Sequence, residues 1–137
     1  IMSRRAVRSE AMKFIYAKTL NDSFTLDEFL FSLTKIKNPK EKEDLELLVD
    51  GITRVEYKLE NFIKQCSNEY EKLNQLDISI LKVGAFELLY SNLPKSIVIN
   101  EAVEIAKEYG DDVSKAIVNA ILDCIGAQYE RQADCCT

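Results

Sequence analysis

The chain has 137 residues, of which 47% are hydrophobic and 30% charged, and its formal net charge at pH 7 is -5. This length is typical of a single compact domain with one core. No run approaches the ~20 apolar residues that span a bilayer, and the first residues lack the apolar core of a secretory signal. We therefore expect one soluble, cytoplasmic domain covering residues 1–137, with no membrane segment.

Charge is unevenly distributed along the chain. Residues 1–20 hold five basic side chains against one acidic side chain, Glu10, so this segment carries +4 and the remainder carries -9. The basic residues are Arg4, Arg5, Arg8, Lys13 and Lys18. An acidic body with one basic end attracts nucleic acid at that end only.

Residues suited to catalysis or metal binding are scarce. Histidine is absent, and the four cysteines, Cys66, Cys124, Cys135 and Cys136, form no C-x-x-C pair. A zinc site and a dithiol redox motif are therefore both disfavoured, and we expect reduced thiols and neither a metal nor a cofactor. Without histidine or an isolated carboxylate pair, we also expect no enzymatic activity.

The chain contains only four glycines and two prolines, which favours helices over a turn-rich β fold. From Arg4 onward, Val7, Ala11, Phe14 and Ile15 recur at helical spacing and predict a first helix with one apolar face. Thr25 and Glu28 have the spacing of a capping box before a short helix through Leu33.

The later helices are also marked by caps and apolar spacing. Asn38 and Pro39 open a helical stretch whose apolar residues recur from Leu45 to Cys66. Asp77 starts the next helix, and the one after it ends at Gly110 as a left-handed cap. Asp111 or Asp112 begins the last helix, and residues 128–137 show little periodicity. We predict an all-α fold of six or seven helices, with a core at about residues 4–127 and a disordered tail.

The first helix is the candidate nucleic-acid site. Arg4 and Arg8 lie four residues apart beside the apolar stripe, and Arg5 shares the neighbouring row with Met12 and Tyr16. The amino end of a helix attracts phosphate, arginine can grip phosphate with two hydrogen bonds, and a tyrosine can stack on a base. A patch this small favours single-stranded RNA over duplex DNA.

A structural interpretation of these arginines stays open beside the functional one. Their methylene stems can lie along the margin of the core while the guanidinium groups pair with acids elsewhere in the chain. A basic helix end could also bind an acidic protein partner, with RNA binding incidental. The sequence alone does not separate these alternatives.

Four segments together carry a family resemblance. They are R-R-x-x-R at the start of the first helix, LDISILKVGAFELLY, SIVINEAVEIAKEYG and IVNAILD, in that order. The chain from about Arg4 to Ile125 resembles the NusB family of bacterial transcription antitermination factors, and INEAVEIAKEYG is the most specific match. The resemblance implies an all-helical bundle of two packed subdomains. It also implies binding of boxA RNA together with the ribosomal protein NusE, within a complex that keeps RNA polymerase elongating.

The resemblance assigns roles to individual residues. Arg4, Arg5 and Arg8 match the arginine-rich RNA-binding motif, and Tyr16 matches the tyrosine that ends it. Ile117 stands where the family places a phenylalanine at the RNA. The remaining two matches, Asp77 and Lys82, belong to the helix near the NusE surface, where Lys82 replaces an arginine and Asp77 could equally cap the helix.

Three polar residues of the family motifs have simpler structural interpretations. We expect Asn100 to cap a helix or satisfy backbone groups, and Glu101 and Asn119 to close hydrogen bonds between helices.

Two further alternatives follow from the resemblance. NusB-like domains also precede ribosomal RNA methyltransferases, although no Gly-rich nucleotide loop follows Ile125 here, and some family members cover their RNA surface by forming a homodimer.

Overall fold

The computed structural model describes residues 4–32, 36 and 38–136, leaving aside the side chains of residues 4, 32 and 131–136. Within this range the chain forms seven α-helices and one short 3-10 helix, with no strand, so the predicted all-α class is confirmed. The elements are α1 (Arg4–Leu20), α2 (Leu26–Ser32), α3 (Pro39–Arg54), α4 (Glu56–Gln65), η1 (Tyr70–Lys72), α5 (Gln75–Tyr90), α6 (Lys95–Tyr109) and α7 (Asp112–Cys136).

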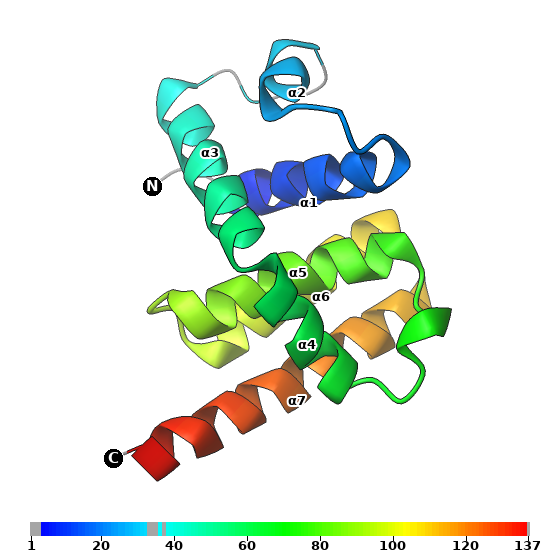
Figure 1. Ribbon diagram of the computed structural model, residues 1–137, viewed down its shortest axis with the longest axis vertical. Helices are drawn as coiled ribbons and strands as arrows, with labels where there is room; N and C mark the ends of the chain where they lie inside the picture. The colour runs from blue at the N-terminus through cyan, green and yellow to red at the C-terminus, as the bar shows by residue number, and fades with distance from the viewer. Residues whose placement is uncertain (1–3, 33–35, 37, 137) are drawn as a thin grey trace.

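The helices form two packed groups. Helices α1 to α3 make the upper group in Figure 1, and α4 to α7 make the lower one. Helix α1 joins the groups because it packs on α5 and contacts both α3 and α6. This arrangement places the amino end of α1 beside helices of both groups.

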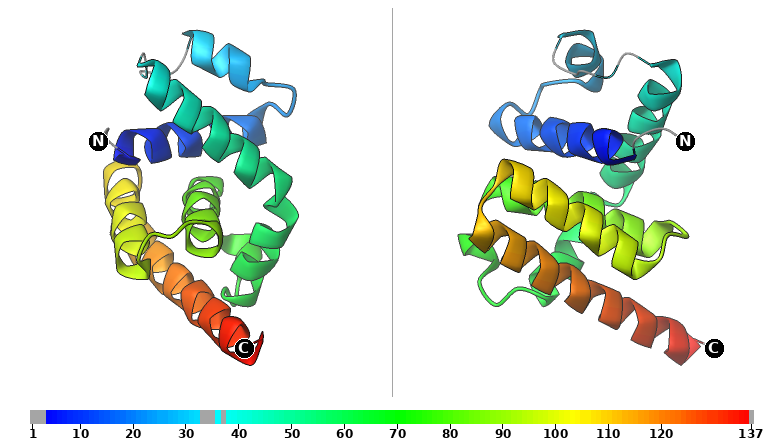
Figure 2. Two further views of the ribbon diagram at one scale, coloured as in Figure 1. Left: turned by 90° about the vertical axis from the view of Figure 1, so that its left-hand side faces the viewer. Right: turned by 180° about the vertical axis from the view of Figure 1, so that it is seen from behind.

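Helix α5 lies at the centre of the bundle. The left view of Figure 2 looks nearly along it and shows α1, α3, α4, α6 and α7 arranged around it. Its sequence, QLDISILKVGAFELLY, has apolar residues on every side, and eleven of its 16 residues are buried, including Asp77, Lys82 and Glu87. At Gly84 an added Cβ would lie 2.7 Å from a methyl group of Leu122, so glycine allows α7 to approach closely.

Local capping signals predicted two helix starts correctly. The Thr25 hydroxyl accepts a hydrogen bond from the Glu28 backbone N–H at 3.1 Å, while the Glu28 carboxylate accepts one from the Thr25 N–H at 2.9 Å. The Asn38 side chain accepts from the N–H groups of Lys40 and Glu41. Both interactions satisfy amide groups that the first helical turn leaves unpaired.

Other helix boundaries differ from the prediction. The apolar stretch from Leu45 to Cys66 is two helices, because the chain turns at Val55 between α3 and α4. The cap of α5 is Asn74, whose side chain accepts from the Asp77 N–H at 2.7 Å, so Asp77 lies in the first turn instead of at the cap. The Asn74 cap is a local hydrogen bond over three residues, which the sequence prediction overlooked.

Gly110 ends α6 without the predicted left-handed conformation. Its φ is -117° and its ψ is -138°, and an added Cβ would lie 2.6 Å from the Ser114 hydroxyl. Glycine is therefore needed for close packing and not for a positive φ. Asp111 then caps α7 as predicted, accepting from the Ser114 N–H at 2.8 Å.

Helix α7 is longer than the predicted last helix. Its backbone is helical to Cys136, and it therefore passes through the segment for which the sequence predicts disorder. The boundaries of the domain stay a prediction. None of the described helices combines the length and apolar character needed to cross a membrane.

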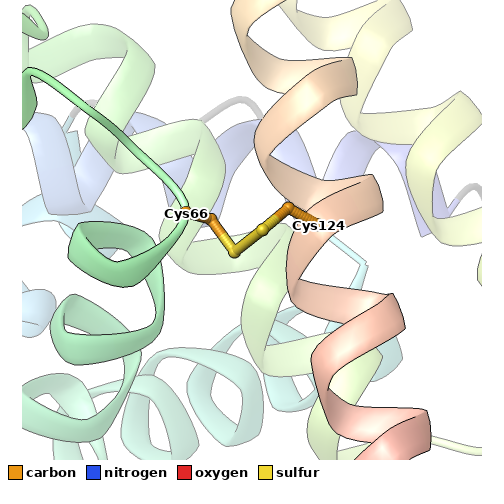
Figure 3. Close-up of a disulfide and its surroundings, with 2 residues drawn as sticks. All are labelled: Cys66 and Cys124. Atoms are coloured by element: carbon orange, nitrogen blue, oxygen red, sulfur yellow. A yellow bond between two sulfur atoms is a disulfide. The ribbon is translucent and has the colours of Figure 1, made fainter.

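Two of the cysteines form a disulfide, which contradicts the expectation of reduced thiols. Cys66 at the end of α4 is bonded to Cys124 on α7, with their Cα atoms 5.8 Å apart (Figure 3). The two positions are 58 residues apart in sequence, and the packing of α4 against α7 brings them together. Side chains of Cys135 and Cys136 lie outside the described residues.

Candidate nucleic-acid interface

The apolar stripe of α1 determines where its arginines lie. Val7, Ala11, Phe14 and Ile15 are all buried, as predicted, and they hold the helix against the core. Arg5 and Arg8 lie beside this stripe near the amino end of the helix, next to α5 and α6. The helix begins at Arg4, whose side chain lies outside the described residues.

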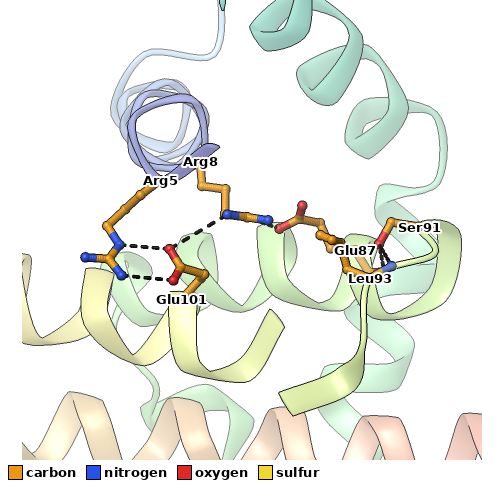
Figure 4. Close-up of polar contacts among 6 residues, drawn as sticks. All are labelled: Arg5, Arg8, Glu87, Ser91, Leu93 and Glu101. Carbon is orange, nitrogen blue, oxygen red and sulfur yellow. Dashed lines mark hydrogen bonds and ion pairs between the residues drawn. The ribbon is translucent and has the colours of Figure 1, made fainter. Parts of the chain in front are cut away.

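Arg5 makes a two-point ion pair with Glu101 of α6. Its Nε donates to Oε1 at 2.8 Å and its Nη2 donates to Oε2 at 2.9 Å (Figure 4). These hydrogen bonds raise the pKa of Arg5 and lower the pKa of Glu101 from its ordinary value. The side chain of Arg5 remains 46% exposed, so the pair lies at the protein surface.

Arg8 is buried, with only 4% of its surface exposed. Its Nε donates to the carboxylate of Glu87 on α5, and its Nη1 lies 3.8 Å from Oε1 of Glu101. A buried arginine needs such partners, because an unpaired charge in the core is strongly unfavourable. An RNA contact by Arg8 stays a prediction, and in this structure its guanidinium group is directed at Glu87 and Glu101 inside the protein.

The structural interpretation of the arginines thus holds for two of the three. Arg5 and Arg8 pair with acids from other helices, and Glu101 closes the interhelical hydrogen bonds that the sequence predicts for it. Sequence reasoning missed Glu87. A signal was present, because a single acid within the apolar run GAFELLY needs a charged partner once that helix is buried.

A recess of about 380 Å³ adjoins Arg5 between α1 and α6. Ser9, Lys13 and Tyr109 line it together with Arg5. The Lys13 ammonium group pairs with Glu10 at 2.8 Å and lies 5.1 Å from the centre of the Tyr109 ring. Three acids, Glu10, Glu41 and Glu108, also line the recess, so the hollow beside the exposed tip of α1 carries mixed charge together with one aromatic ring.

Two further predicted RNA residues lie apart from this tip. Tyr16 is half-buried near the other end of α1, about 18 Å from Arg4 along the helix axis. Ile117, also half-buried, lies on α7 and packs against the core. Among the described contacts, none joins Tyr16 or Ile117 to Arg5 or Arg8.

Asn100 and Asn119 are exposed, and they line a groove of about 400 Å³ between α6 and α7.

The predicted partner-binding residues are buried. Lys82, 6% exposed, pairs with Glu56 at 2.7 Å and with Glu60 at 3.3 Å, which ties α5 to α4. Asp77, 2% exposed, has a raised pKa because burial disfavours its charge, although a hydrogen bond with Ser114 partly opposes this effect.

A partner surface at Asp77 and Lys82 stays a prediction, and in this structure both side chains are covered, Lys82 against α4 and Asp77 against α7. Sequence pattern alone could not show this covering. Across the part of the chain that the structure describes, no cluster of three or more His, Cys, Asp or Glu side chains could hold a metal ion.

Comparison with known proteins identifies relatives of this arrangement. The sequence model of the NusB family matches residues 5–126. Transcription antitermination protein NusB of Campylobacter jejuni subsp. doylei is 34% identical over 128 residues, covering 90% of this chain and 95% of the relative. The protein of the same description from Finegoldia magna is 38% identical over 130 residues, covering 90% of this chain and 93% of its own length.

Solved structures give the same result for the fold. NusB of T. maritima superimposes with a TM-score of 0.84 at 28% identity, covering 93% of both chains. A chain from a crystal structure described as antitermination factors NusB and NusE in complex with dsRNA superimposes with a TM-score of 0.83 at 25% identity. That match covers 92% of this chain and 97% of the solved one.

Proposed function

The chain belongs to the NusB family, and we propose that it is a transcription antitermination factor that binds boxA-like single-stranded RNA together with NusE. The observation that carries the proposal is the match of family and fold over nearly the whole chain, including a solved relative described in complex with NusE and RNA. Relatives of this chain carry the name of a regulatory protein and not of an enzyme.

The RNA contact that we propose is the tip of α1. Arg4 begins the helix, and Arg5 keeps nearly half of its side-chain surface exposed beside the recess that includes Lys13. Helix N-termini attract phosphate, and exposed guanidinium groups bind it with directed hydrogen bonds. Arg8 supports this tip from inside the protein, while Tyr16 and Ile117 remain proposed contacts at separate positions.

We propose that this protein contacts NusE, without assigning the contact to particular residues. Because Asp77 and Lys82 are buried, they shape the partner surface only indirectly, by fixing α5 against α4 and α7. Two modest contacts, one with RNA and one with NusE, produce tight joint binding, since the second forms at high effective concentration. We propose that this joint complex acts on RNA polymerase in the cytoplasm, and that a homodimer would compete with it.

A titration of labelled RNA tests the α1 site. Replacing both Arg4 and Arg5 with alanine should weaken binding of single-stranded boxA RNA, whereas the Arg54→Ala, Lys72→Ala double variant changes the net charge equally at exposed positions elsewhere. If Arg4 and Arg5 of the wild-type protein each neutralise one phosphate, a plot of log affinity against log salt for wild type should have a slope of about -1.4. Equal affinities for the two double variants would refute the site.

The same titration compares single-stranded with duplex RNA. Duplex RNA of the same sequence is a necessary arm, because the solved relative is described with dsRNA. The small size of the exposed tip leads us to expect tighter binding of the single strand. Tighter binding of the duplex would keep the RNA role and overturn the preference for single strands.

A second candidate function is recognition of an acidic protein by the same tip. It is supported by the Arg5–Glu101 pair, in which this guanidinium group donates two hydrogen bonds to one carboxylate. Affinity capture from a nuclease-treated lysate separates the two functions. Full retention of a protein partner, without any RNA preference in the titration, would favour this candidate.

A further inference from the structure

Four charged side chains form a line from the core to the surface. Glu87 of α5 contacts Arg8 of α1, Arg8 approaches Glu101 of α6, and Glu101 pairs with Arg5 of α1 (Figure 4). Charges alternate along this line, and the side chains become progressively more exposed, at 3%, 5%, 18% and 46%. The line therefore connects a buried ion pair to the exposed guanidinium group that we propose binds RNA.

Glu101 occupies only one edge of the Arg5 guanidinium group. Its two oxygens accept from Nε and Nη2, and Figure 4 shows the remaining terminal nitrogen of Arg5 on the side away from Glu101. A guanidinium group carries five N–H donors. The edge formed by the two terminal nitrogens is therefore left to a second ligand while Glu101 stays in place.

We propose that Glu101 is a positioning residue for RNA binding, which fixes Arg5 so that its outer edge faces a phosphate. This inference rests on the proposed function, since it assigns a role within the same site. A free arginine side chain loses much rotational freedom when it binds, and a side chain that is already held loses less. Glu101 itself is held by Arg8, so Arg8 acts on the site without touching RNA.

The sign of the effect distinguishes this role from simple electrostatics. Glu101 places a negative charge beside the bound phosphate, so Coulomb repulsion alone predicts that removing this charge tightens RNA binding. If Glu101 only competes with RNA for Arg5, its removal should also tighten RNA binding. Positioning predicts the opposite result, because Arg5 without Glu101 loses its fixed orientation.

Glu101→Gln tests the inference, with Glu104→Gln as the matched control. Glu104 is on the same helix and acts on Arg5 only through its charge, so the two variants change the net charge equally. In titrations with single-stranded boxA RNA, Glu101→Gln should bind about fivefold more weakly than wild type, the range of one exposed charge pair. Glu104→Gln should bind as wild type does or slightly more tightly.

Two further measurements separate positioning from a general structural effect. Nitrogen-edited NMR of the Arg5 Nε–H group should show a protected signal in wild type and in Glu104→Gln, and its loss in Glu101→Gln. In an Arg5→Ala background, Glu101→Gln should change RNA affinity no further. Thermal unfolding checks that each variant is folded.

Several results would overturn the inference. Tighter binding by Glu101→Gln than by Glu104→Gln would show that the carboxylate competes with RNA, and equal affinities would show that Glu101 has no role. Weaker binding with an unchanged Arg5 signal, or weaker binding that persists without Arg5, would also exclude positioning. If wild-type protein binds no RNA, the proposed function itself fails, and this inference fails with it.

Discussion

The Cys66–Cys124 disulfide should contribute strongly to stability. It links α4 to α7 across a separation of 58 residues, a segment that contains α5 and α6. For a closed loop of this length, the chain-entropy relation gives about 14 cal per mol per kelvin, or ~4 kcal/mol at room temperature. In a domain of this size, a loss of that order should lower the unfolding midpoint by about 15 °C.

Differential scanning calorimetry of oxidised and reduced protein measures this loss. Cys66→Ser and Cys124→Ser should each lower the midpoint to about that of the reduced protein, because either change removes the same bond. The Cys135→Ser, Cys136→Ser double variant is the control and should keep the full response to reductant. Alkylation followed by peptide mapping should label Cys66 and Cys124 only after reduction.

Coincident midpoints for oxidised and reduced protein would refute the entropic reasoning. Free labelling of Cys66 and Cys124 without reductant would show that the bond does not form in solution. In a reducing compartment the glutathione pool converts exposed disulfides to thiols. Both cysteines are half-buried, so we expect reduction under native conditions to be measurable by the same mapping.

Three other substitutions test the buried charges. Glu87→Ala should lower the free energy of unfolding by roughly 3–5 kcal/mol in urea, because it leaves the Arg8 charge buried with a weaker partner; a loss below about 1 kcal/mol would contradict this. Lys82→Met should change stability by less than about 1.5 kcal/mol, since its partners Glu56 and Glu60 remain partly exposed to water and the apolar stem is kept. Asp77→Asn should stabilise the protein at pH 7. Burial raises the pKa of Asp77 in the folded protein above its ordinary value of 3.8. Protonated Asp77 therefore contributes its full stabilisation below pH 3.8, and this contribution is lost as the pH rises through the folded-state pKa. The advantage of the variant should therefore shrink as pH falls through that window, and an advantage that does not change with pH would exclude Asp77 as its cause.

Sequence alone determined the features that depend on neighbours in the chain. The caps at Thr25 and Asn38, the apolar face of α1, and the basic charge at its tip all follow from residues within one or two turns. Hydrogen bonds to helix ends and helical spacing are local, so they can be inferred without knowing the fold. The same local signals predicted the all-helical class, and the family motifs added the expectation of two packed subdomains.

Tertiary structure alone decided which charges are exposed and what they contact. Glu101 and Glu87 are 96 and 79 residues from Arg5 and Arg8, so nothing local indicates which acid each arginine meets. Lys82 and Asp77 are polar residues on a helix that neighbours cover completely at those positions, and Cys66 meets Cys124 only after α4 packs on α7. Burial and ion pairing depend on the positions of distant helices, so they follow from the packing around α5 and not from spacing along the chain.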